Sequence, residues 1–132
     1  MKVLTLEVKS LEEALEQASR ELRVPKSHIE VVVVDKKGLM KKTLIVEAKI
    51  KVDPAEVGYE LLAEMFDNMN IDVSIEMRRK GENEISYNIN SSENPILIGK
   101  NGKTLESIQF YIRNIINMYS DERQIVLVDI GG

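Results

Sequence analysis

The sequence predicts an α+β protein made of two small units in tandem, with element orders β-α-β-β and then α-β-β-α-α-β. Apolar and polar residues alternate over several short stretches, as half-buried strands require. Between these stretches, apolar residues recur at the spacing of amphipathic helices. In mid-chain, Asp53-Pro54 combines a helix cap with a proline at the first helical position, which marks a new start with almost no linker. We therefore expect units at residues 1–52 and 53–132.

The first unit should contain one helix and three strands. Ser10 and Glu13 have the spacing of a capping box, and Pro25 ends the helix that follows. The expected elements are a strand over residues 2–8, a helix from Leu11, strands over residues 29–34 and 44–52, and a turn at Lys36-Lys37-Gly38.

The second unit should contain three helices and three strands. The first expected element is a helix from Pro54, whose apolar stripe consists of Val57, Leu61, Leu62, Met65, Phe66 and Met69. Strands over residues 71–78 and 85–90 and a short helix over residues 93–98 follow. The last two elements are a helix with Leu105, Ile108, Ile112, Ile115, Ile116 and Tyr119 on one face, and a strand over residues 124–129. This last strand is apolar on both faces, so we expect it at the centre of the sheet.

The stretch Gly99-Lys100-Asn101-Gly102 lies between the last two helices and is the candidate site. Glycine tolerates positive φ and lets another backbone approach closely. The following helix offers unpaired N–H groups and the positive end of its dipole, an arrangement that suits phosphate. Lys100, Asn101 and Lys103 add side-chain donors. The alternative is a glycine turn between two helices that binds nothing.

The residues around this turn, Ile-Leu-Ile-Gly-Lys-Asn-Gly-Lys-Thr-Leu-Glu-Ser-Ile-Gln, resemble the GXXG loop of KH domains, which clamps about four nucleotides. The element order of the second unit is that of a type II KH domain. In the first unit, Leu-Glu-Glu-Ala-Leu, Glu-Leu-Arg-Val-Pro and Lys-Lys-Gly-Leu resemble the Jag N-terminal domain. Nearly the whole chain thus resembles the SpoIIIJ-associated protein family, also called Jag or KhpB, from bacteria.

The sequence departs from that family in two places. Relatives usually carry further glycines after Lys-Lys-Gly-Leu, where this chain has Met40-Lys41-Lys42. The family usually continues into a C-terminal domain with an Arg-x-x-x-His motif, which this sequence lacks. We expect either a truncated form or a divergent relative.

The resemblance implies a single-stranded RNA-binding protein, an RNA chaperone or post-transcriptional regulator. The expected RNA-binding residues are Ile98, Gly99, Lys100, Asn101, Gly102, Lys103 and Leu105. Ile108 would add to an apolar groove, and Gln109 would face either a base edge or solvent. We find no aromatic residue beside the loop for base stacking, so we expect weak, sequence-tolerant and salt-sensitive binding.

A second hypothesis is a protein-interaction adaptor in cell elongation and envelope growth, with roles in cell shape and cell wall biogenesis. By resemblance, its partner would be a second small KH protein, in a homodimer or heterodimer. The N-terminal domain would then associate with the membrane or the division machinery.

Composition limits the chemistry. The chain has no Cys and a single His, His28, which excludes thiolate nucleophiles, Cys-ligated zinc and multi-His metal sites. We expect no cofactor, no metal and no enzyme activity. No apolar run has the length of a signal peptide or membrane helix, so we expect a cytoplasmic protein.

Charge is unevenly distributed along the chain. Residues 1–53 carry 11 Lys and Arg against 9 Asp and Glu (+2), whereas residues 54–132 carry 7 against 13 (−6). RNA binding by the second unit must therefore depend on a local basic spot. Lys36, Lys37, Lys41 and Lys42 form either a solvated hairpin tip or a second patch that contacts phosphate.

Overall fold

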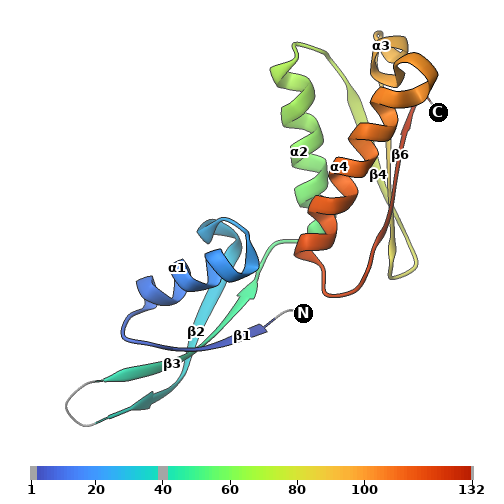
Figure 1. Ribbon diagram of the computed structural model, residues 1–132. Coiled ribbons are helices and arrows are strands. Elements are labelled where there is room, and N and C mark those ends of the chain that lie inside the picture. The colour runs from blue at the N-terminus through green and yellow to red at the C-terminus, as the bar shows by residue number, and fades with distance from the viewer. Residues whose placement is uncertain (1–2, 39–41, 132) are drawn as a thin grey trace. The chain divides into compact units, whose positions relative to one another are not determined.

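The computed structural model describes residues 3–38 and 42–131, which form two compact units, Met1–Val52 and Asp53–Gly132 (Figure 1). The predicted α+β class and both element orders are confirmed, with short 3₁₀ turns added at Lys26–His28 and Lys100–Gly102. Over the described ranges, no helix has the length and apolar character needed to cross a membrane.

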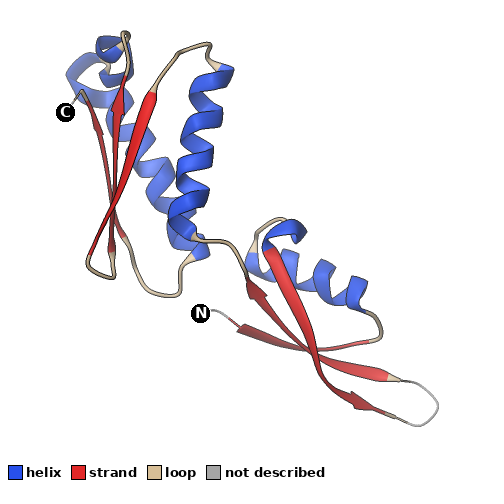
Figure 2. Cartoon of the chain, turned by 180° about the vertical axis from the view of Figure 1, so that it is seen from behind, coloured by secondary structure: helices blue, strands red, loops and turns tan. Residues whose placement is uncertain are grey.

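The first unit is an antiparallel sheet with one helix packed on one face (Figure 2). Its elements are β1 (Val3–Val8), α1 (Leu11–Leu22), β2 (Ile29–Lys37) and β3 (Thr43–Ile50), with strand order β1-β3-β2. Val8, Ala14, Ala18 and Val46 are among the fully buried residues between helix and sheet.

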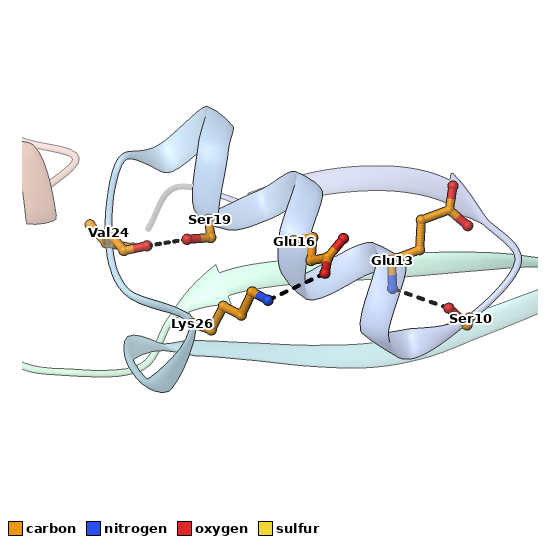
Figure 3. Close-up of polar contacts among 6 residues, drawn as sticks. All are labelled: Ser10, Glu13, Glu16, Ser19, Val24 and Lys26. Atoms are coloured by element: carbon orange, nitrogen blue, oxygen red, sulfur yellow. Dashed lines mark hydrogen bonds and ion pairs between the residues drawn. The ribbon is translucent and has the colours of Figure 1, made fainter.

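Local hydrogen bonds fix both ends of α1 (Figure 3). Ser10 Oγ accepts from the Glu13 amide at 3.1 Å, and the Glu13 carboxylate accepts from the Lys9 amide at 2.9 Å. At the other end the chain turns left-handed at Arg23, and Ser19 Oγ donates to the Val24 carbonyl at 2.7 Å. The predicted start and end of this helix are confirmed.

The predicted turn at Lys36-Lys37-Gly38 is wrong for its two lysines. β2 continues through Lys37, which pairs with Thr43, after a register irregularity between Val33 and Asp35. Lys36, Lys37 and Lys42 are exposed, and Lys37 Nζ lies 3.2 Å from a Glu7 carboxylate oxygen. Lys41 lies outside the described residues, so the predicted four-lysine patch stays a prediction.

The second unit places helices on one face of a mixed sheet, so that the opposite face is left open to solvent (Figure 2). Its elements are α2 (Pro54–Asn68), β4 (Ser74–Lys80), β5 (Glu84–Asn90), α3 (Asn94–Ile98), α4 (Lys103–Tyr119) and β6 (Ile125–Ile130). The strand order is β4-β5-β6, antiparallel for the first pair and parallel for the second. The core includes Leu62, Phe66, Tyr87, Ile89, Ile112 and Ile116.

The prediction of a central position for the last strand is wrong, because β5 is central and β6 is an edge strand. Val126, Val128 and Ile130 are buried against the helices, but Ile125 and Leu127 are 49% and 45% exposed on the open face. Apolar residues on both faces of a strand therefore do not mean burial of both faces here.

Two side-chain contacts hold the start of α2 to the sheet. Asp53 caps the helix by accepting from the Ala55 amide at 3.0 Å, and its carboxylate forms an ion pair with Arg79 of β4. The buried Tyr87 hydroxyl donates to the Ala55 carbonyl. A side chain at Gly58 would meet Ile116 Cδ1 at 2.8 Å, so the bare backbone there allows α2, α4 and Tyr87 to pack closely.

The remaining boundaries differ from prediction by a few residues. Met69 of the predicted helix stripe is 49% exposed, because it lies just past the end of α2. Ile71 and Val73 pack against the core from the connection before β4.

Candidate nucleic-acid interface

The predicted site is the corner where α3 meets α4, which we call the glycine corner (Gly99–Gly102). α3 is short and is stabilised from its own loop, since Asn94 Oδ1 accepts from the Ser91 amide at 2.8 Å. The buried side chain of Leu97 anchors α3 to the core, and the Gly99 amide donates to the Pro95 carbonyl at 3.1 Å. The corner is therefore held on a packed scaffold.

The two glycines of the corner serve different purposes. Gly99 (φ 77°) packs against α4, and a Cβ there would lie 2.7 Å from Thr104 Cβ and 3.0 Å from the Thr104 amide nitrogen. Gly102 (φ 72°) faces open space, with no atom within 4 Å of a Cβ added there. Gly99 thus closes the turn, and Gly102 leaves room for a ligand backbone. Asn101 is also left-handed (φ 59°), a conformation that asparagine tolerates.

Two amides of the corner are free to bind a ligand and two are not. The Gly102 amide donates to the Gly99 carbonyl at 3.3 Å, and the Lys103 amide donates to the Lys100 carbonyl. The amides of Lys100 and Asn101 have no hydrogen-bond partner among the described residues. The side chains of Lys100, Asn101 and Lys103 are all exposed. Hence the expected row of amides over Lys100–Lys103 is reduced to its first two members.

The apolar residues predicted for the site lie beneath and beside the corner. Ile98 and Leu105 are half-buried and pack against the core, so part of each side chain stays accessible. Ile108 is only 8% exposed and belongs to the core. Its predicted contribution to a groove wall is therefore minor.

Gln109 was expected either to face solvent or to contact a base edge, and its side chain does not project freely into solvent. Its side-chain oxygen accepts from the Val128 amide at 2.9 Å and so joins α4 to the edge strand β6. The other expected role, contact with a base edge, stays a prediction, but this oxygen is already engaged.

The expectation that no aromatic residue stands directly beside the loop stays a prediction, but an exposed aromatic residue lies further along α4. Phe110 lies two turns along α4 from Lys103 and is 58% exposed. Together with Lys103, Glu106 and Ser107, it lines a depression of about 380 Å³. The guanidinium carbon of Arg113 lies 5.3 Å from the centre of its ring. Applying the seven-residue helical spacing from Lys103 would have found it; inspection of the loop's sequence neighbours alone did not.

Tyr111 is a second exposed aromatic residue of α4, on the side that faces α2. It is 46% exposed and borders a depression of about 420 Å³ with Leu61, Glu64, Met65 and Asn68.

Comparison with known proteins identifies the family. The family model described as "KhpA/KhpB, KH domain" matches residues 56–128, and the family model described as "Jag N-terminus" matches residues 6–54. The chain belongs to the KhpA/KhpB KH family. Together the two matches confirm the predicted resemblance, a Jag N-terminus followed by a KH domain.

Two curated relatives carry the same name. The chain is 32% identical over 129 residues to RNA-binding protein KhpB from Clostridium symbiosum, and this alignment covers 92% of the chain. It is 28% identical over 138 residues to RNA-binding protein KhpB from Bacillus subtilis, and here 98% of the chain is covered. The chain spans 58% and 64% of the length of these relatives.

Proposed function

We propose that this chain binds single-stranded RNA by gripping its phosphate backbone with the glycine corner. The observation that carries the proposal is the pair of unpaired amides at Lys100 and Asn101, beside two exposed lysines. The names of both relatives and the match to a KH domain support RNA as the ligand.

In this mechanism each part of the corner has one task. The amides of Lys100 and Asn101 donate to phosphate oxygens, and Lys100 and Lys103 supply positive charge. The open space at Gly102 admits the ligand backbone. The accessible parts of Ile98 and Leu105 contact the bases. The unit has a net negative charge, so binding is weak and depends on salt.

We propose that this binding serves an RNA chaperone or post-transcriptional regulator that acts in the cytoplasm. A backbone grip with no reading of base edges suits such a role, because it accepts many sequences.

The test is the double variant Lys100→Asp with Asn101→Asp, which places carboxylates where phosphate would bind. We expect loss of oligo-uridine binding at low salt, measured by fluorescence anisotropy, with an unchanged melting temperature. The matched control is Lys80→Asp with Asn83→Asp, which changes the same residue types and the same charge at the β4–β5 turn. It should bind nearly as the parent does. Equal affinity of both variants would remove the corner from the mechanism.

The second candidate function is an adaptor that pairs with another small KH protein or a second copy of this chain. The exposed Tyr111, with Leu61 and Met65 beside it, favours this reading, because partly apolar surface on a helix pair suits a protein partner. Sedimentation of the same samples with and without RNA separates the two functions. An RNA-independent dimer that protects the glycine corner would favour the adaptor.

A further inference from the structure

The solvent-facing side of α4 carries a continuous stripe that begins at the glycine corner. Lys103, Ser107, Phe110 and Asn114 follow one another at spacings of three and four residues, which places them on one helix face. Phe110 lies about 10 Å along the axis from Lys103, since a helix rises about 1.5 Å per residue. A chain held at the corner can therefore continue directly onto this stripe.

Phe110 is the large apolar residue of that polar stripe. Its ring is 58% exposed and forms one wall of the depression that Lys103, Glu106 and Ser107 complete. Arg113 lies one turn further on, with its guanidinium 5.3 Å from the ring centre, a geometry that steadies the ring by cation–π attraction. An ordered aromatic ring beside two cations provides the components for stacking a base and holding the adjoining phosphate.

The depression at Phe110 and the depression at Tyr111 differ in the charge of the residues around them. Lys103 and Glu106 line the first, and Arg113 lies over the Phe110 ring, so two cations outnumber one carboxylate there. The second is lined by Glu64 and has no cation among its lining residues. A polyanion is therefore favoured at Phe110 and disfavoured at Tyr111, although both rings are exposed on the same helix.

We propose that Phe110 is a stacking platform for a base that lies beyond the nucleotides at the glycine corner, with Arg113 and Lys103 holding the connecting phosphates. This inference rests on the proposed function, because it needs the RNA to be anchored at the corner. It assigns the protein a longer RNA footprint than the corner alone provides.

The test compares two oligo-uridine probes, one of about four nucleotides, the length that a GXXG loop clamps, and one of about eight. Phe110→Ala should weaken binding of the longer probe by roughly 5- to 150-fold, the usual range for loss of one aromatic–base stack. It should leave the shorter probe unaffected. Phe110→Tyr should keep the affinity of the parent, because the ring is retained. Tyr111→Ala is the matched control and should change neither affinity.

The outcomes separate this inference from the proposed function. Failure of the parent to bind either probe overturns both. Parent binding with equal affinity of Phe110→Ala for the longer probe overturns the platform alone, as does an equal loss for both probe lengths. Loss of a dimer in Phe110→Ala, with RNA affinity kept, would assign the ring to a protein partner and also overturn the platform.

Discussion

Gly99 and Gly102 are equivalent in the sequence motif, but their surroundings differ. Both have positive φ, which costs about 1–2 kcal/mol for a residue with a side chain. Gly99 has the added constraint of Thr104, whose Cβ and backbone nitrogen leave no room for a methyl group. Gly102 has no such neighbour. The motif therefore combines one glycine that close packing requires with one whose surroundings are open.

Alanine at the two positions should accordingly give different stabilities. We expect Gly102→Ala to lose about 1–2 kcal/mol, from backbone strain alone. Gly99→Ala should lose clearly more, because the clash with Thr104 forces α3 and α4 apart. Thermal melts followed by circular dichroism measure both. Equal melting temperatures would mean that α4 shifts at little cost and that Gly99 has no packing role.

Strand β6 shows how an edge strand is protected at the level of one element. The Val128 amide donates to Gln109 and the Ile130 amide to the Asp129 side chain at 2.9 Å, so neither is left for another strand. Satisfied edge amides discourage pairing between sheets of different molecules. Gln109 of α4 thus also protects the edge of the sheet from pairing with another strand.

Gln109→Ala should expose the Val128 amide. We expect a loss of about 1 kcal/mol in the free energy of unfolding, the usual value of one hydrogen bond, and faster hydrogen exchange at Val128. Gln109→Glu keeps an acceptor oxygen and serves as the control. Unchanged exchange at Val128 in the alanine variant would show that the bond contributes nothing to the edge.

The elements themselves were predictable because their signals are local. Caps at Ser10 and Asp53 and the periodicity of the helices depend on neighbours within one or two turns. The position of β6 in its sheet was not predictable, since the same apolar pattern fits a strand at the centre of a sheet and a strand with one face in water. The exposed position of Phe110 was also missed, because a residue two helical turns away shares a face with Lys103 only once α4 is folded.

At the scale of the whole molecule, the buried Tyr87 and the half-buried Tyr119 make stability depend on pH at the alkaline end. Burial raises the pKa of Tyr87 and of Tyr119 above the ordinary value of 10.0. Between pH 10 and the raised values, the folded chain keeps protons that the unfolded chain releases. The free energy of unfolding is therefore full below about pH 10 and falls as the pH rises above it.

We expect urea midpoints to be constant from pH 7 to about pH 9 and to fall above about pH 10. Tyr87→Phe should weaken this fall, because one titrating group is gone, while losing about 1 kcal/mol at neutral pH with the bond to Ala55. Tyr59→Phe alters an exposed side chain of α2 and should reproduce the parent curve. A parent midpoint that rises above pH 10 would contradict the burial of these hydroxyls.

The parallel pairing of β5 with β6 has a consequence for synthesis of the protein on the ribosome. The segment that joins these two strands is α3, the glycine corner and α4, and its core residues pack on Val126, Val128 and Ile130. When the glycine corner and α4 have left the ribosome but β6 has not, the nascent chain still lacks the strand on which these elements pack. Competence for a ligand should thus appear abruptly, only after Ile130 has left the exit tunnel.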